Sequence, residues 1–311
     1  MNPTIIECFN PATGEKLGEV AALSPAEVDA VVARAHVAQQ AWAQTSFAKR
    51  RAVFTTLLRT ILDHMDAICA AVVQDGGKTF ENAALGEVMT SVNKIRWLIK
   101  NGERYLKPEK VSQGGPLLHK KGHIEYRPLG VVAAIVPWNY PFQNIFASFA
   151  DPLMAGNAVV LKASEAVAWS TQLFQQLINS VFDQHGISRD TVQILNGYGA
   201  TGAALVRADV QKILFIGSVA NGRRIVADSA QRLTPTVMEL GGKDPLIVCD
   251  DADVDRAVHS ALGGCFVNLG QSCVAPERVL VQAGIYDRFV QQVQNLVASL
   301  RQGHAAQPGS V

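Results

Sequence analysis

Residues 131–216 alternate short apolar, β-prone runs with helical stretches, and this alternation constrains the fold more than any other feature of the sequence. The runs are 131–136, 158–162, 192–195 and 212–216, with helical patterns near 141–155, 168–184 and 200–207 between them. Such runs are typical of βαβ units, in which a parallel sheet is covered by helices on both faces. Ligands of these sheets bind at the carboxyl ends of the strands. The residues that follow each run are therefore the first candidates for a functional site.

Composition excludes several classes of protein. The chain has 311 residues, of which 48% are hydrophobic and 18% are charged, as in folded globular proteins of about two domains. A net charge of +1 argues against nucleic-acid binding. The longest apolar stretch ends at Pro137 and is too short to span a bilayer, and no signal peptide is evident. Five cysteines without paired spacing indicate a reducing compartment, so we expect a cytoplasmic protein, and we expect no metal.

The first hundred residues are predicted to be helical and to serve packing. Ser24 and Glu27 form a capping box with a proline between them, which predicts a helix start. Two further helical patterns cover about 54–68 and 81–104. Residues 107–118 are predicted to form a loop, and 119–127 an exposed strand of a projecting hairpin.

Two of the strand ends carry groups suited to a nucleotide. Lys162 and Glu165 follow the second run, where a carboxylate can accept the hydroxyls of an adenosine ribose. A solvated ion pair is the alternative, and in isolation it is favoured. Gly217 and Ser218 lead into a helix with Gly222 in its first turn, which allows a phosphate to approach free N–H groups. Plain helix capping is the commoner reading of such a turn, and the G-x-G-x-x-G fingerprint is absent.

Two further residues indicate covalent chemistry. Glu239 follows an apolar pair and precedes Leu-Gly-Gly, which predicts that it faces a partly buried site. Cys273 follows a predicted helix, 253–268, and a glycine-containing turn, a plausible presentation for a nucleophile. A buried, inert thiol is the commoner fate of a single cysteine. We assign that fate to the other four, which are Cys8, Cys69, Cys249 and Cys265.

The ordered set of motifs resembles the NAD(P)-dependent aldehyde dehydrogenase superfamily over nearly the whole chain. The motifs are PWNYPF at 137–142, Lys162-x-x-Glu165, Phe215-x-Gly217-Ser218, Glu239-Leu-Gly-Gly-Lys243 and Gly270-Gln-x-Cys273. Each is weak alone, but their order and spacing are specific. One departure is Ala163, where the family usually has proline.

The resemblance implies roles for ten residues. Cys273 is implied to be the nucleophile, Glu239 the general base, and Asn139, with the N–H of Cys273, the oxyanion hole. The cofactor contacts implied are Trp138, Lys162, Glu165, Gly217, Ser218, Gly222 and Leu240. The implied activity is oxidation of an aldehyde to the carboxylic acid through a cysteine thiohemiacetal and thioester. NAD is the expected hydride acceptor because the Glu165 carboxylate would repel a 2′-phosphate, although NADP also occurs with this glutamate.

The resemblance also implies a division of the chain. The expected fold is α/β, with a Rossmann-type parallel-sheet cofactor-binding domain (1–108 and 129–238), a projecting, oligomerisation-like hairpin (109–128) and an incomplete α/β catalytic domain (239–311). The family is homo-oligomeric, and its catalytic domain continues beyond position 311 with a Glu-x-Phe-Gly-Pro segment and an oligomer strand, so we expect a truncated chain. Other readings stay open: an inactive or NAD-binding remnant, a subunit that needs a full-length partner, or a thiol esterase. A CoA-acylating enzyme is disfavoured because such enzymes commonly lack the base that Glu239 would supply.

Overall fold

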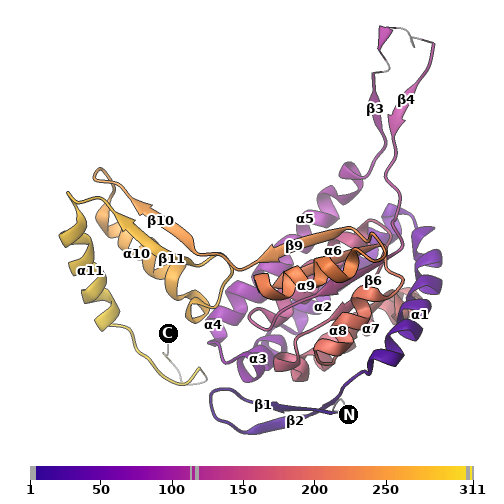
Figure 1. Cartoon of the computed structure of the whole chain (residues 1–311). Helices are drawn as coiled ribbons and strands as arrows, with labels where there is room; N and C mark the ends of the chain where they lie inside the picture. Colours follow the sequence, from indigo (N-terminus) through magenta and orange to yellow (C-terminus); the bar gives the residue numbers. More distant parts are fainter. Residues whose placement is uncertain (1–4, 113, 116–118, 306–308, 310–311) are drawn as a thin grey trace.

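A five-stranded parallel sheet forms the centre of the protein (Figure 1). The computed structural model describes residues 5–112, 114–115, 119–305 and 309. The sheet has the order β7-β6-β5-β8-β9, with all neighbours parallel. Its strands are β5 (Val131–Ile135), β6 (Ala158–Lys162), β7 (Val192–Leu195), β8 (Lys212–Gly217) and β9 (Thr236–Leu240). The four strands predicted from apolar runs are confirmed, and so are the parallel sheet and its α/β class.

Helices cover both faces of the sheet because its strands are apolar on both sides. The sheet residues Ala134, Val136, Val159 and Leu161 pack in one core with α2, α3, α5, α6 and α7. The alternate residues Val131, Ala133, Ala158 and Val160 pack in a second core with α1 and α8. Helices of the βαβ units are α6 (Pro141–Met154), α7 (Ala168–His185), α8 (Gly199–Arg207) and α9 (Val219–Ser229), with short 3₁₀ turns at Glu165–Val167 and Arg189–Thr191. The period-two alternation of a strand thus explains the two cores.

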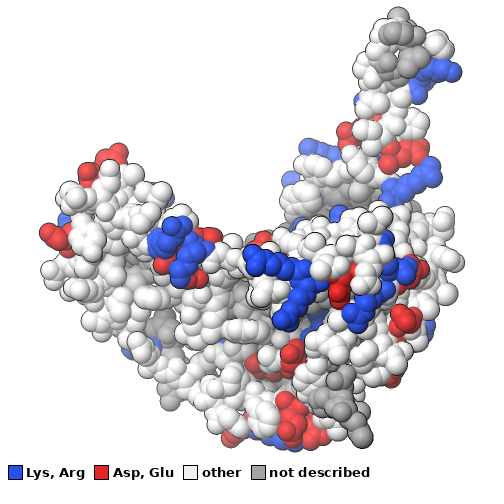
Figure 2. All heavy atoms as spheres, viewed as in Figure 1, with Lys and Arg blue, Asp and Glu red and all other residues white. Residues whose placement is uncertain are grey.

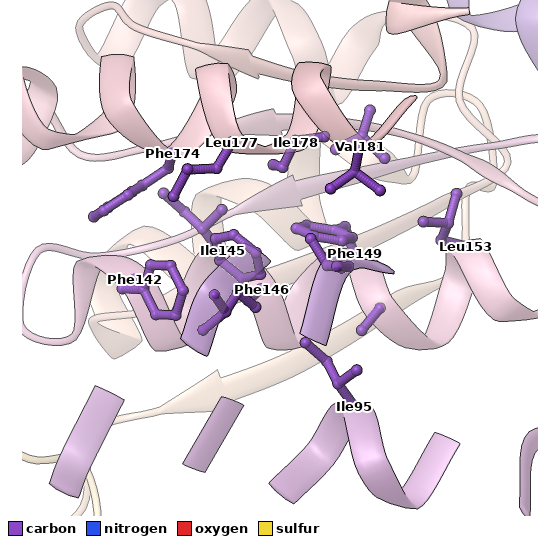
Figure 3. Close-up of a cluster of buried hydrophobic side chains, with 14 of the residues drawn as sticks. Ile95, Phe142, Ile145, Phe146, Phe149, Leu153, Phe174, Leu177, Ile178 and Val181 are labelled. Atoms are coloured by element: carbon purple, nitrogen blue, oxygen red, sulfur yellow. The ribbon is translucent and has the colours of Figure 1, made fainter. Parts of the chain in front are cut away.

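An aromatic cluster between α6 and α7 fills the larger core (Figure 3). Phe146 stacks on Phe142 with ring centroids 4.1 Å apart and lies 5.0 Å from Phe149. Phe174 of α7 meets Phe142 edge-on at 5.1 Å. All four rings are buried, so this cluster fixes α6 against the sheet and, with it, the loop that precedes α6.

The N-terminal segment differs from the prediction that the first hundred residues are all helical. An antiparallel pair, β1 (Ile5–Phe9) and β2 (Lys16–Ala21), comes first. Ile6, Cys8 and Val20 face inward onto Ala168 while their neighbours face out, and this alternation outweighed helix propensity. The helices that follow are α1 (Pro25–Ala43), α2 (Phe47–Asp63), α3 (Met65–Gly76), α4 (Phe80–Ala83) and α5 (Thr90–Tyr105), with a π-helical turn at Ala84–Met89. The predicted helix start holds, since the Glu27 carboxylate accepts the Ser24 N–H at 2.9 Å.

Two further pairs of strands lie outside the central sheet. β3 (Glu109–Val111) and β4 (Gly122–Ile124) are antiparallel and extend away from the body in Figure 1. After β9 the chain forms a separate lobe with its own small core. This lobe contains β10 (Asp244–Val248), α10 (Val254–Phe266), a 3₁₀ turn (Val267–Gly270), β11 (Pro276–Val281) and α11 (Tyr286–Ala298). Its two strands are parallel.

The surface shows mixed charge. Lys and Arg are interspersed with Asp and Glu on the face shown in Figure 2. Within the described residues, no helix is both long and apolar enough to cross a bilayer.

Candidate active site

A pocket of about 610 Å³ lies where the central sheet meets the C-terminal lobe. Five segments line it: the π-helical turn and start of α5 at Gly86 and Thr90, the loop after β5 with the start of α6, the carboxyl end of β8, the end of β9 and the turn before β11. Six residues predicted from the sequence take part in its lining: Trp138, Asn139, Gly217, Ser218, Glu239 and Cys273. The structure therefore brings the three residues with implied catalytic roles to one cavity.

The loop between β5 and α6 presents Asn139 to the cysteine turn. The Asn139 amide donates to the carbonyl of Gln271 at 2.9 Å, and its oxygen accepts from Asn144 Nδ2 at 3.3 Å. An asparagine amide carries two N–H donors, so the bond to Gln271 leaves one for a substrate oxygen. Trp138, beside it, is 41% exposed and forms part of the pocket wall.

The turn that carries Cys273 has a strained backbone. The helix predicted to reach Asn268 ends at Phe266, because Asn268 and Leu269 adopt left-handed conformations with φ of 54° and 59°. Asn268 is buried, and its Nδ2 donates to the carbonyls of Asn139 at 2.9 Å and Gln271 at 3.2 Å. Unfavourable backbone conformations of this kind persist where the surroundings enforce them, often at functional sites.

Glu239 and Cys273 meet in the pocket. Burial raises the pKa of the Cys273 thiol above its ordinary value, and a hydrogen bond to Glu239 and the charge of that carboxylate raise it further. Backbone N–H groups of Cys273 and Val274 act on this pKa in the opposite direction. The Glu239 side chain itself is exposed, although it lines the pocket. Its position at the end of the edge strand β9 leaves one side open.

Lys162 and Glu165 form an ion pair of 2.9 Å at the carboxyl end of β6, outside the pocket lining. Lys162 is buried, with its stem beside Gly202 of α8, whereas Glu165 is exposed. Burial raises the pKa of Glu165, but the Lys162 ammonium outweighs it and holds that pKa below its ordinary value. The pair is thus neither a free surface contact nor a fully buried one.

Two glycines in the turn from β8 into α9 leave room for neighbouring side chains. A side chain at Gly217 would lie 2.6 Å from the Phe215 ring, so only glycine fits there. The Ser218 hydroxyl accepts the N–H of Asn221 and caps α9, which leaves the N–H groups of the first two helical residues pointing outward. Gly222 gives room to Leu240, whose Cδ2 would be 2.9 Å from an added Cβ. Gly222 and Leu240 lie outside the pocket lining.

The remaining cysteines divide into three environments. Cys8 and Cys69 are buried, and burial raises the pKa of each to about 11, as expected for inert thiols. Cys265 is half-buried, and its thiol donates to the carbonyl of Pro276 at 3.1 Å. Cys249 is exposed, so its assignment to a buried position is wrong. It directly follows Val248, the last residue of β10, which is buried in the core of the C-terminal lobe.

Several residues of the site were missed from the sequence. Gln271 and Asn268 connect the cysteine turn to Asn139, and the Tyr140 hydroxyl interacts with Ser272 of the same turn. Their polar side chains lie in loops, where sequence gives no periodicity to interpret. The only indication in the sequence was that these residues lie in or next to the motifs at 137–142 and 270–273. Among the described residues, no group of three or more His, Cys, Asp or Glu side chains is placed to hold a metal.

Comparison with known proteins gives consistent matches. The aldehyde dehydrogenase family is matched over residues 1–311. An aldehyde dehydrogenase-like protein of Schizosaccharomyces pombe is 35% identical over 96% of this chain. Succinate-semialdehyde dehydrogenase [NADP(+)] GabD of Escherichia coli is 32% identical over 99% of it. The chain spans 57% and 63% of the lengths of these two relatives.

The fold is also found in solved structures. PnpE of Pseudomonas sp. WBC-3, in a crystal structure with nicotinamide adenine dinucleotide, superimposes with a TM-score of 0.92 at 31% identity. The match covers 98% of this chain and 62% of that one.

Proposed function

This chain belongs to the aldehyde dehydrogenase family, and we propose that it contains the nucleophile, the general base and the cofactor contacts for NAD-dependent oxidation of an aldehyde to its acid. The observation that carries the proposal is the meeting of Asn139, Glu239 and Cys273 at one pocket. These three side chains come from three segments of the chain, and together they offer a sulfur nucleophile, a carboxylate base and an amide donor.

The proposed reaction begins with Glu239 taking the proton of the Cys273 thiol, which lines the same pocket. The thiolate adds to the aldehyde carbon, and the resulting oxyanion accepts N–H bonds from Asn139 and the Cys273 backbone. NAD, when bound, supplies the acceptor for the hydride, and a thioester remains on Cys273. After the first proton has passed to solvent, Glu239 takes a proton from the water that attacks the thioester carbonyl and returns it to the departing sulfur. The acid leaves and the thiol is restored.

The proposed cofactor site lies along the carboxyl edge of the sheet. Lys162 and Glu165 would hold the adenosine ribose, and the N-terminus of α9 at Gly217 and Ser218 would hold the pyrophosphate. The N–H groups in the first turn of α9, which have no partner within the helix, support the fit. Trp138 would pack beside the nicotinamide, and Leu240 beside Gly222 would shape the turn. We propose NAD as the preferred cofactor because Glu165 is exposed and anionic.

The proposed organisation keeps the predicted division into a cofactor-binding domain (1–108 and 129–238), a hairpin (109–128) and a catalytic part (239–311). The exposed apolar residues Ile124 and Tyr126 support a role of the hairpin in an oligomer contact. A reducing, cytoplasmic location would keep Cys273 as a thiol.

The test is cofactor reduction by the chain with a panel of aldehydes and either NAD or NADP, run beside Cys273→Ala. We expect turnover with NAD that Cys273→Ala abolishes. Turnover that survives in Cys273→Ala contradicts the proposed nucleophile. Calorimetric binding of NAD without turnover would select the cofactor-binding remnant or the partner-dependent subunit instead. Cofactor-independent ester hydrolysis that is lost in Cys273→Ala, without aldehyde turnover, would select the esterase.

A further inference from the structure

Lys78 and Glu87 form a buried ion pair far in sequence from the catalytic motifs. Nζ of Lys78 lies 2.6 Å from Oε1 of Glu87, and the two residues are 3% and 0% exposed. Burying two charges carries a large desolvation cost, and apolar residues of similar size often give equal or better stability. The contacts of the two side chains therefore indicate a role beyond general stability.

Glu87 holds the start of α6. Its Oε2 accepts the N–H groups of Phe142 at 2.7 Å and Gln143 at 3.0 Å, in the first turn of that helix. The N-cap residue Tyr140 supplies no side-chain cap of its own. The Glu87 carboxylate thus satisfies two free donors and places a negative charge at the positive end of the helix.

Lys78 holds the residue before that helix. Its ammonium donates to the carbonyl of Asn139 at 2.7 Å and lies 4.2 Å from the centroid of the Tyr140 ring. The same carbonyl accepts Asn268 Nδ2 from the cysteine turn. The peptide that follows Asn139 is therefore held from two sides, by Lys78 and by Asn268.

The local structure around Glu87 is shaped for this contact. Glu87 lies in a π-helical turn, an irregularity found mostly at functional sites. Thr90 Oγ1 donates to the carbonyls of Gly86 and Glu87. A side chain at Gly86 would lie 3.1 Å from the Tyr140 ring, so the glycine leaves room for that ring. The π-helical turn thus places Gly86 and Glu87 against segment 139–143, which Lys78 also contacts.

We propose that Lys78 and Glu87 are positioning residues for Asn139: they fix its main chain so that its amide meets the oxyanion formed at Cys273. The inference rests on the proposed function. Neither side chain touches the reacting atoms. Their effect passes through the Asn139 carbonyl and the first turn of α6.

The decisive experiment is a double-mutant cycle with Asn139. Lys78→Met and Glu87→Gln, made singly and together, each lower kcat for aldehyde oxidation about tenfold to a hundredfold with little change in KM. In an Asn139→Ala background the same substitutions cost no more than about twofold, because the group on which they act is gone. Additive losses in the two backgrounds overturn the proposal.

The matched control is Asp75→Asn. Asp75 is likewise buried and accepts the N–H of Ser170 in the first turn of another helix, α7, at 2.8 Å. We expect it to change stability but not kcat. Loss of kcat in Asp75→Asn equal to that of Lys78→Met would reduce the effect to general destabilisation and overturn the proposal.

A second readout does not need turnover. Hydrogen exchange of the amides in segment 139–143 should quicken at least tenfold in Lys78→Met and Glu87→Gln, while exchange in the strands β5 and β6 stays within about twofold. The double substitution covers the case in which a single uncompensated charge prevents folding. If the wild-type chain shows no turnover, the proposed function fails, and unchanged exchange at 139–143 then overturns the positioning role independently.

Discussion

The Glu239 carboxylate and the Cys273 thiol interact at one pocket, although they belong to the edge strand of the large sheet and to a turn of the C-terminal lobe. The carboxylate has two opposed effects on the sulfur. It can accept the thiol proton, and its charge disfavours the thiolate, which raises the pKa of Cys273. A cysteine so placed is held protonated until a carbonyl carbon is in reach.

Replacement of Glu239 should therefore make Cys273 more acidic. In Glu239→Gln the charge is lost, so the pKa of Cys273 falls toward its ordinary value and alkylation by iodoacetamide at neutral pH becomes about three to ten times faster. The measurement is the alkylation rate of the Cys273 peptide against pH. Glu277→Gln, which removes an exposed carboxylate bound to Lys243, is the control and leaves this rate unchanged. An unchanged or higher pKa in Glu239→Gln contradicts the prediction.

Glu165 should set the preference between the two nicotinamide cofactors. In Glu165→Gln the repulsion of a 2′-phosphate is lost and the ribose contact weakens, so the ratio of NADP to NAD affinity rises about tenfold or more. Calorimetric titration with both cofactors measures this ratio.

A second Lys–Glu pair serves as the control for that experiment. Glu19 pairs with Lys16 at the same spacing on β2, and Glu19→Gln should leave both affinities unchanged. Equal ratios in Glu165→Gln and wild type would remove Glu165 from the cofactor site.

Gly222→Ala should disturb the cofactor turn through Leu240. The added Cβ would lie 2.9 Å from Leu240 Cδ2, so that side chain must shift, and we expect NAD affinity to fall about threefold to tenfold. Gly263→Ala is the matched change, since nothing lies within 4 Å of its Cβ on α10. It should raise stability by about 0.5–1 kcal/mol without altering NAD affinity. Equal NAD affinities in wild type and Gly222→Ala would count against the role of this turn.

The buried Asp75 should make stability depend on pH. Burial raises the pKa of Asp75 to about 6, above its ordinary value of 3.8. Between these values the folded protein keeps a proton that the unfolded chain has released, so stability falls as pH rises through this window. In Asp75→Asn this contribution is absent. The stability of the variant relative to wild type should thus grow by about 2–3 kcal/mol from pH ~4 to pH ~7. Denaturant unfolding at both pH values tests this, and a constant difference contradicts it.

The central sheet was predictable because strands buried on both faces leave continuous apolar runs, as at 131–136 and 158–162. The hairpin β1–β2 was not, because Ile6 and Cys8 are buried partly by Ala168 of α7, which lies far away in the sequence. Candidate site residues were found where the chemistry needs a rare side chain, as at Cys273. The contacts of Lys78, in the loop before α4, and of Glu87 escaped notice because charged residues are ordinarily solvated.

The pocket joins two bodies that are packed separately. Asn139 and Glu239 are anchored to the large sheet, whereas Cys273 belongs to a lobe with its own small core. The polar links at Gln271 and Asn268 bridge the two. A slight rotation of the lobe would change the distance from sulfur to amide while leaving both interiors intact. On heating, catalytic activity should consequently be lost at a lower temperature than the one at which the central domain or the lobe unfolds.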